Sequence, residues 1–415
     1  MNEKKLTFID LFAGCGGLSE GFLQTGKYEA LAHIEWEMPM VKTLRNRLVR
    51  RWGHQPDDAF KKVIHFDIQK TKALIGGSWD LATSNLYSKT NHCLIKNGGL
   101  KELIGKKKVD LIIGGPPCQA YSIAGRAQDK NSMKDDYRNY LFESFVKMVD
   151  EFRPKVFIFE NVPGLLSACP GDTPVTQRIY RAFKKIGYEI RSPEFQKNSV
   201  YTATEFGVPQ KRNRVIIIGV NSDTKLDLES LYTEINLLKQ NLNPRTVKDA
   251  IFHLPKFVPL KLAIKQDGGN VSHRSVGGPK ITDHEPRFHN KRDVGIFTKW
   301  IKDGMNTRTS EEKILFYNKL LGKSSNHAKY RNLTWNKPSP TIVAHLYKDG
   351  LMFIHPDIEQ ARSITVKEAA LLQSFPDDYE FLASQGFCFK MIGNAVPPEM
   401  SRNIAEAIYT GLGKK

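Results

Sequence analysis

The hydrophobic and polar positions of the first 220 residues alternate between two periods. Short apolar runs, of the kind found in buried strands, are followed by longer stretches with helical spacing, and this alternation is typical of successive βα units. The expected strands are 7–11, 28–34, 63–67, 111–114, 156–160, 188–192 and 215–219. The pattern therefore predicts an α/β fold with a doubly wound, mostly parallel sheet.

The alternation of strand-like and helix-like segments ends near residue 225. From there to about 350 the chain is rich in Pro, Gly, His and basic residues and has weak periodicity, so we expect a smaller, irregular domain over 226–355. This domain is inserted between two parts of the first, 1–225 and 356–415. In the last part, Glu368 lies in the first turn of a helix expected over 365–374, and Pro397 and Pro398 begin a helix that runs to about Leu412.

Charge points to a polyanionic partner. The 415 residues contain 62 Lys and Arg against 44 Asp and Glu, a net charge of +18. Residues 241–350 hold 20 of these basic residues and 9 of the acidic ones, a net charge of +11, together with six of the 11 histidines. Such a concentration is the electrostatic footprint of a protein that binds nucleic acid.

Cysteine usage and hydropathy indicate the compartment. The five cysteines are scattered and include no C-x-x-C pair, which argues against a disulfide framework and against a zinc site. The N-terminus lacks the apolar stretch of a signal peptide, and no run of about 18 apolar residues occurs. We expect a cytoplasmic protein that makes no use of a membrane or a metal.

Several strand ends carry groups suited to a cofactor. Residues 8–17 read FIDLFAGCGG, a strand that enters a glycine turn and then a helix, so a ligand can approach the backbone closely. A dinucleotide fingerprint needs a third glycine where Ser19 stands, which disfavours NAD. Glu35 ends the next strand and could accept ribose hydroxyls, and Trp36 offers a flat face to a purine. Asp67 and Ile68 follow the third strand and could bind the adenine.

Residues 115–122 read GPPCQAYS and follow an apolar strand. The two prolines end the strand and hold Cys118 at the carboxyl edge of the sheet, where open α/β folds bind their ligands. An isolated cysteine is more often a buried, inert side chain. In this chain the context favours a reactive Cys118 instead, because the motifs ENV at 160–162 and QKRNR at 210–214 follow it in order along the sequence.

These segments, with GNAVPP at 393–398, resemble the DNA (cytosine-5) methyltransferases of prokaryotic type over most of the chain outside about 225–330. The resemblance implies a Rossmann-like fold that binds S-adenosyl-L-methionine. It places the cofactor at Phe12, Gly14, Gly16, Gly17, Glu35, Trp36, Asp67, Ile68, Pro117, Asn394 and Val396.

The same resemblance implies a catalytic set. Cys118 is the candidate nucleophile for C6 of a flipped-out cytosine, and Glu160 is the candidate partner of N3. Arg214 would bind O2 and orient Glu160, while Arg212 would position the loop or the phosphate near the base. Because they are two residues apart on an extended segment, both arginines are expected on one face.

The DNA contacts are expected from two regions. The candidates are Gln119, Ser122 and Arg126 after the nucleophile, Gln210, Arg274, Arg287, Arg292 and Thr341. His273, His284 and His289 could also offer donors to base edges, and metal binding by them is disfavoured because no thiol or paired carboxylate accompanies them.

The expected activity is therefore methylation of cytosine C5 in a short site of double-stranded DNA by a monomer, which either protects the genome from a partner restriction endonuclease or acts alone in regulation. A tRNA cytosine-5 methyltransferase can share this catalytic architecture, although the basic insert favours duplex DNA. A DNA-binding protein that has lost catalysis is the alternative outside enzymes, and intact Cys118, Glu160 and Arg214 count against it.

Overall fold

The computed structural model of the chain describes residues 4–117, 141–239, 244–266, 268–322, 324–327, 329–348 and 350–413. The chain forms two compact units. Unit 1 consists of Met1–Gly207, Asn213–Asn241 and Ala395–Lys415, and unit 2 of Val208–Arg212 and Leu242–Asn394. These units divide the chain at other points than the expected domains: α11 (Leu228–Leu237) lies in unit 1, and residues 356–394 lie in unit 2.

Unit 1 is built on an eight-stranded sheet with the order β3-β2-β1-β4-β5-β9-β6, in which β7 also pairs with β9. Strand β9 is antiparallel to β5, β6 and β7, and the other pairings are parallel. The prediction of a doubly wound, mostly parallel sheet is confirmed, and β7 is the one strand of this sheet that the apolar pattern did not predict. The strands are β1 (Leu6–Leu11), β2 (Tyr28–Glu35), β3 (Val63–His65), β4 (Leu111–Gly114), β5 (Val156–Asn161), β6 (Tyr188–Ile190), β7 (Val200–Thr202) and β9 (Asn213–Asn221).

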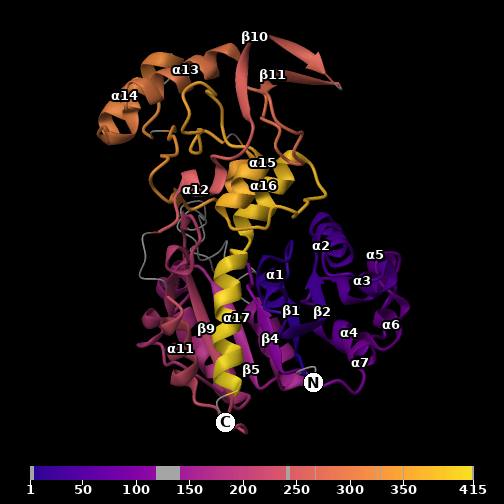
Figure 1. Cartoon of the computed structure of the whole chain (residues 1–415). Helices are drawn as coiled ribbons and strands as arrows, with labels where there is room; N and C mark the ends of the chain where they lie inside the picture. Colours follow the sequence, from indigo (N-terminus) through magenta and orange to yellow (C-terminus); the bar gives the residue numbers. More distant parts are fainter. Residues whose placement is uncertain are drawn as a thin grey trace. The chain divides into compact units, whose positions relative to one another are not determined.

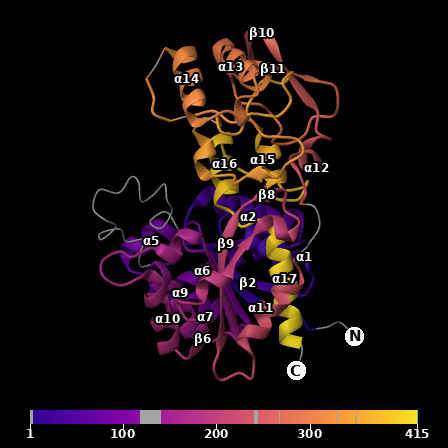
Figure 2. The same cartoon turned by 90° about the vertical axis from the view of Figure 1, so that its left-hand side faces the viewer.

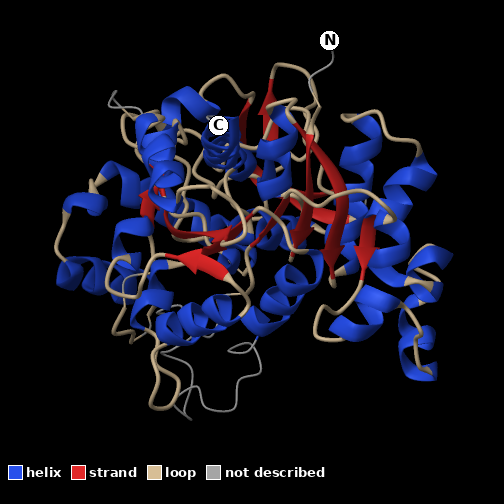
Figure 3. Ribbon diagram, turned by 90° about the horizontal axis from the view of Figure 1, so that it is seen from below, coloured by secondary structure: helices blue, strands red, loops and turns tan. Residues whose placement is uncertain are grey.

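Helices cover both faces of this sheet (Figures 1, 2 and 3). On one face α17 packs against both α1 and α11, and on the other α9 packs against α4 and α10. The bounds are α1 (Gly17–Gln24), α2 (Met38–Arg50), α3 (Pro56–Lys62), α4 (Thr71–Gly76), α5 (Leu81–Tyr87), α6 (Cys93–Asn97), α7 (Gly99–Ile104), α9 (Leu141–Phe152), α10 (Val175–Lys185) and α17 (Pro398–Gly413). The long crossover at 71–108 thus contains four short helices, α4 to α7.

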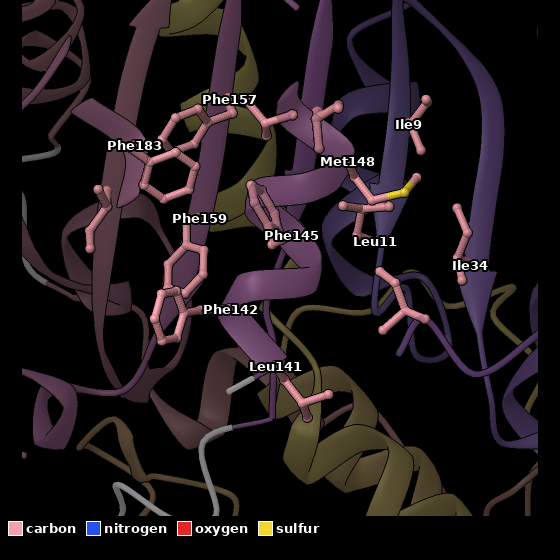
Figure 4. Close-up of a cluster of buried hydrophobic side chains, with 14 of the residues drawn as sticks. Ile9, Leu11, Ile34, Leu141, Phe142, Phe145, Met148, Phe157, Phe159 and Phe183 are labelled. Carbon is pink, nitrogen blue, oxygen red and sulfur yellow. The ribbon is translucent and has the colours of Figure 1, made fainter. Parts of the chain in front are cut away.

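The largest hydrophobic cluster of unit 1 lies between the sheet and α9. Buried apolar residues recur on this helix at positions 141, 142, 145, 148 and 149, the spacing of one helical face. Figure 4 shows Phe145 and Met148 among side chains from the strands, including Leu11 and Phe159. The rings of Phe157 and Phe183 stack with centroids 4.0 Å apart. This packing fixes the strands whose carboxyl ends carry the candidate chemistry.

Glycines bring α17 close to α1. A Cβ atom built on Gly21 would lie 2.4 Å from the backbone nitrogen of Arg402 and 2.5 Å from the carbonyl oxygen of Pro398. On Gly17 it would lie 2.4 Å from the carbonyl oxygen of Val396. Larger residues would hold the two helices apart, so this contact requires glycine at both positions.

Unit 2 contains more regular structure than its weak periodicity predicts. Its elements are β8 (Gln210–Lys211), α12 (Val247–Ile251), β10 (Lys256–Gln266), β11 (Gly269–Val276), α13 (Lys291–Lys302), α14 (Ser310–Leu321), β12 (Ser339–Pro340), η6 (Ala344–Tyr347), α15 (Val366–Leu372) and α16 (Gln385–Asn394). Buried residues of α13, among them Phe297 and Trp300, form one hydrophobic cluster with Tyr317 of α14 and with Tyr330. Strands β10 and β11 form a separate antiparallel pair.

A buried ion pair stabilises the second half of unit 2. Two nitrogens of Arg362 donate to the two carboxylate oxygens of Glu368 at 2.7 and 2.6 Å, and both side chains are buried. The same carboxylate accepts from the backbone N–H of Thr365, whose hydroxyl in turn accepts from the N–H of Glu368. This is a capping box, and it explains why α15 begins near the position that the sequence predicted. No helix in the described part of the chain is long and apolar enough to cross a membrane.

Candidate active site

A glycine loop joins β1 to α1. Phe12, Gly14 and Gly16 have positive φ angles of 59°, 58° and 91°. Such a conformation is strained for phenylalanine, and strain of this kind is concentrated at functional sites. Gly16 is the N-cap residue of α1, so the loop leads directly into the positive end of a helix.

Glu35 holds this loop from the end of the neighbouring strand β2. One of its carboxylate oxygens accepts from the backbone N–H of Gly14 at 2.8 Å, and the other accepts from the N–H groups of Trp36 and Glu37 at 2.8 and 2.7 Å. Burial raises the pKa of Glu35 to about 7. A carboxylate offers about four acceptor positions, so these three hydrogen bonds leave room for about one further donor rather than for both hydroxyls of a ribose.

The other predicted cofactor residues follow adjacent strand ends. Trp36 is 53% exposed directly after β2, and Asp67 and the buried Ile68 lie two and three residues after β3. Because β3, β2 and β1 are neighbours and parallel, these groups share one edge of the sheet. Val396 reaches the same loop through its contact with Gly17. Asn394 is exposed and belongs to unit 2.

A buried polar network lies beneath the glycine loop. The hydroxyl of Ser19 donates to the carboxylate of Asp10 and lies 3.0 Å from Nδ1 of His33. All three side chains are fully buried, and they join β1, α1 and β2. Ser19 departs from the dinucleotide fingerprint, and this network gives that position a structural role.

Glu160 and Arg214 meet at the ends of β5 and β9. The Nε atom of Arg214 lies 2.6 Å from a carboxylate oxygen of Glu160, so the sequence correctly predicted that these side chains would contact each other. A Cβ atom added to Gly115 would lie 2.4 Å from the other carboxylate oxygen. The amide nitrogen of Asn161 donates to the carbonyl oxygen of Pro116 at 3.2 Å. The carboxylate of Glu160 therefore lies against the segment that leads through Pro117 into Cys118, and Arg214 is bonded to its other oxygen.

Four predicted residues lie outside the described part of the chain. These are Cys118, Gln119, Ser122 and Arg126. Conversely, the sequence analysis gave no role to Gly115 or Asn161, which the structure places beside Glu160 and Pro116. The only signal for either residue was its membership of the motifs at 115–122 and 160–162.

Arg212 and Arg214 do not share one face as expected. Two nitrogens of Arg212 donate to the carbonyl oxygens of Ile342 and Gly393, each at 2.9 Å, and the side chain is 1% exposed. The reason is that the chain leaves unit 2 and enters unit 1 between residues 212 and 213. In this structure Arg212 joins segments of unit 2, whereas Arg214 pairs with Glu160.

Gln210 is held in a similar way. Its side chain is fully buried, donates to the carbonyl oxygen of Leu372 at 3.2 Å and accepts from the backbone N–H of Ile342 at 2.9 Å. Complete burial argues against the direct DNA contact expected for this residue. Thr341 is half-buried, and its hydroxyl donates to the carbonyl oxygen of Lys211 at 2.6 Å.

The predicted recognition residues between 273 and 292 divide into two groups. Arg274 and Arg292 are exposed. Arg287 instead donates to the carbonyl oxygen of Leu346, and its guanidinium lies 4.2 Å from the ring centroid of Phe389. Arg287 thus supports η6 within unit 2.

The histidines expected to offer donors to base edges are buried. The ring nitrogens of His273 and His284 bond to the carbonyl oxygens of Gln360 and Pro255, each at 2.9 Å, and His289 lies 3.1 Å from the hydroxyl of Ser363. Burial lowers the pKa of all three rings. The expectation that they face DNA is wrong, because long-range packing places them in the interior of unit 2. Among the described residues no cluster of His, Cys, Asp and Glu could hold a metal ion.

Comparison with known proteins assigns almost the whole chain to the family that the sequence resembles. The model of the C-5 cytosine-specific DNA methylase family matches residues 6–410. The type II methyltransferase M.Bpa9945I of Bacillus paralicheniformis is 34% identical, over 96% of this chain and 98% of that protein. The type II methyltransferase M1.HphI of Haemophilus parahaemolyticus is 32% identical, over 97% of this chain and 86% of that protein.

Solved structures share the fold. A protein assigned as a DNA modification methyltransferase encoded within a prophage of E. coli is 22% identical, with a TM-score of 0.65 over 99% of this chain and 100% of that one. The Dnmt2 methyltransferase of S. pombe is 10% identical, with a TM-score of 0.53 over 99% and 100%. Together with the match along residues 6–410, the sheet and its strand-end residues lead to one conclusion: the chain belongs to the C-5 cytosine-specific DNA methylase family.

Proposed function

We propose that this protein transfers a methyl group from S-adenosyl-L-methionine to C5 of one cytosine in a short double-stranded DNA site, through a covalent bond between Cys118 and C6. The observation that carries the proposal is the position of the buried Glu160–Arg214 pair. It lies against Gly115, three residues before the candidate nucleophile. A carboxyl group and a guanidinium at that point can bind the N3 and O2 edge of a base.

The proposed reaction requires both the Cys118 thiolate and the Glu160–Arg214 pair. Cytosine C5 is a weak nucleophile, and addition of the Cys118 thiolate to C6 supplies electron density to it. The charge that develops on the ring is stabilised by a proton shared between the carboxyl group of Glu160 and N3, and by Arg214 at O2. C5 would then take the methyl group, and the sulfonium sulfur would keep the electron pair of the broken S–CH₃ bond and become a thioether. Loss of the C5 proton to water restores the C5–C6 double bond and releases the thiolate, so that no redox partner is needed.

The described residues fit the proposed cofactor. The glycine loop leads into the positive end of α1, and the exposed indole of Trp36 can cover an adenine ring. Glu35 retains about one acceptor position for a ribose hydroxyl, in addition to its role in holding the loop. S-adenosyl-L-methionine, when bound here, supplies an electrophilic methyl group on a sulfonium. Asp67 and Ile68 are the candidates for contact with the adenine.

The first test is Glu160→Gln. Removing a group that stabilises developing charge or transfers a proton is expected to lower kcat by about 10²- to 10⁴-fold, while cofactor affinity measured by calorimetry stays within about twofold. The matched control is Glu229→Gln, because Glu229 also forms an ion pair of 2.6 Å with an arginine of unit 1, Arg191. Methyl incorporation near the wild-type rate in Glu160→Gln would contradict the proposed role.

The second test is Cys118→Ser. It is expected to abolish methyl transfer and leave DNA binding largely intact, because the hydroxyl is a far weaker nucleophile than a thiolate. A duplex that carries 5-fluorocytosine at the target should trap the wild-type protein covalently, since fluorine cannot leave as a proton does, and should not trap the variant. Cys169→Ser changes an exposed cysteine elsewhere in unit 1 and serves as the control. Trapping of the Cys118→Ser variant would exclude Cys118 as the nucleophile.

We further propose that the protein acts as a monomer and protects DNA from a restriction endonuclease. The two relatives described above are named type II methyltransferases, which supports this role. Methylation sequencing of DNA from cells that express the protein would identify the site, and resistance of that DNA to cleavage at the same site tests protection. Methylation of tRNA in place of duplex DNA in a competition assay would favour the alternative substrate.

A further inference from the structure

The pair of strands β10 and β11, called the ribbon below, is anchored at one end and exposed at the other. At its base, the ring of Phe257 packs edge-on against His284 with centroids 5.1 Å apart, and its backbone N–H donates to Gln360 at 3.0 Å. On β11 the ring of His273 is bonded to the carbonyl oxygen of Gln360. Figure 1 shows the two strands extending away from α15 and α16. Contacts within unit 2 therefore hold the base in place.

The end of the ribbon away from its base is exposed. Residues 261–266 and 268–270 are all exposed. Leu262 is 79% exposed and Ile264 is 50% exposed, in a strand pair that buries neither side at this end. An isolated strand pair is marginally stable in water, and exposed aliphatic residues on it carry an aggregation risk. This arrangement indicates a surface that is covered when a partner is bound.

The charge of the ribbon identifies the kind of partner. Between residues 256 and 276 the sequence has four basic residues and one acidic residue. Lys256 at the base is paired with Asp357 at 2.9 Å. Lys261, Lys265 and Arg274 are exposed and form no ion pair with an acidic side chain of the described residues. A polyanion can therefore bind the three cations without breaking an existing pair.

The register places apolar and basic groups on different sides. Ile264 lies opposite Val271, and the next pair is Lys265 with Asn270. Successive residues of a strand point to opposite sides, so one side of the tip carries aliphatic groups and the other a cation and an amide. The register is irregular between Pro259 and Ile264, and Leu262 lies in that segment. An aliphatic side can contact thymine methyl groups, and the polar side can reach base edges or phosphates.

We infer that the ribbon enters the major groove of duplex DNA and selects bases there with Leu262 and Ile264, while Lys261 and Lys265 bind phosphates. This rests on the proposed function in that the partner is the DNA substrate. The strand segment from Lys261 to Gln266 spans roughly 16 Å at about 3.3 Å per residue. A major groove about 12 Å wide and 8.5 Å deep admits such a strand pair.

The electrostatic part is tested with Lys261→Ala/Lys265→Ala. Loss of two phosphate contacts should reduce the slope of log affinity against log salt by about 1.8, so the affinity lost between 50 and 200 mM salt becomes about 12-fold smaller than for the wild type. The weakening should be alike for all DNA sequences. Lys184→Ala/Lys185→Ala removes the same charge from exposed positions of α10 and is the control. Equal slopes for both double variants would overturn the inference.

The base-reading part is tested with Leu262→Ala and Ile264→Ala, by binding to a library of duplexes in which each position of the methylated site is varied. A lost contact with a thymine methyl should reduce the preference at one position roughly fourfold, with the other positions unchanged. Leu315→Ala, an exposed leucine of α14, is the control. An unchanged preference in both ribbon variants, or self-association of the wild type that the same variants abolish, would show that the ribbon has another role. Failure of the wild type to methylate any duplex would instead reject the proposed function.

Discussion

Acidification from about pH 7.5 to about pH 5 is expected to destabilise unit 2 through three histidines that are buried in the neutral form. Burial lowers the pKa of His273 to about 4 and the pKa values of His289 and His355 to about 3. The exposed fractions of these residues are 4%, 6% and 2%. In the unfolded chain each ring titrates near pH 6.5. The folded state therefore binds fewer protons than the unfolded state over the whole interval.

The sign and magnitude follow from proton linkage. A group whose pKa is lower in the folded state loses stabilising free energy as the pH falls below its unfolded pKa. At about pH 5 the loss is about 2 kcal/mol for each histidine, or about 6 kcal/mol for three. Typical domains are stable by about 5–15 kcal/mol. Arg362 holds the pKa of Glu368 well below its usual range, so that carboxylate stays ionised throughout, whereas the raised pKa of the single Asp283 opposes the loss.

Hydrogen exchange measured by mass spectrometry, corrected for the intrinsic pH dependence of exchange, can localise the effect. Protection of peptides from 268–322 and 350–394 should fall on acidification more than protection of β4 and β5. In urea titrations, His355→Gln and His289→Gln should each reduce the pH dependence of the unfolding free energy by about one proton, and His253→Gln, at an exposed position, should not. Protection of unit 2 that does not change between about pH 7.5 and pH 5 would refute the reasoning.

Two further predictions concern unit 1. Burial raises the pKa of Glu35 to about 7, and the ionised form is the better acceptor, so affinity for S-adenosyl-L-methionine should rise about tenfold between about pH 6 and pH 8. Calorimetry should show no such rise in the Glu35→Gln variant. A rise in both proteins would contradict the role of this carboxyl group. Gly21→Ala should lower the free energy of unfolding by at least about 1–3 kcal/mol, because the added Cβ would meet the backbone of α17. Gly76→Ala, where a Cβ meets nothing within 4 Å, is the control, and equal melting temperatures for the two variants would exclude the close contact.

The sequence was most informative where structure depends on local pattern. Buried strands appear as short apolar runs, so all seven expected strands were found. The capping box of α15 and the prolines at the start of α17 likewise act within a few residues. The Glu160–Arg214 contact could be anticipated because a family motif places both residues at strand ends.

The sequence was least informative where a side chain's partner lies far along the chain. His289 meets Ser363, 74 positions away, and Arg212 meets Gly393, 181 positions away. Arginine is mostly exposed in proteins and histidine is intermediate, so only tertiary packing decides where these side chains lie. The same limit applies to unit 2 as a whole. Its helix α14 has only one buried residue, Tyr317, so its apolar period was too weak to detect.

The glycine contact between α1 and α17 has a consequence for synthesis of the protein. The end of α1 at Gln24 and the start of α17 at Pro398 are 374 positions apart. At about 5–20 residues per second, a ribosome needs roughly 20–75 seconds to extend the chain from one to the other. During that time the surface of α1 around Gly21 has no α17 to cover it, and unit 2 has been made in full. All strands of the sheet have been made by Asn221, but unit 1 cannot complete its packing until α17 has emerged. Until then the nascent chain exposes to chaperones the surface of α1 that α17 covers.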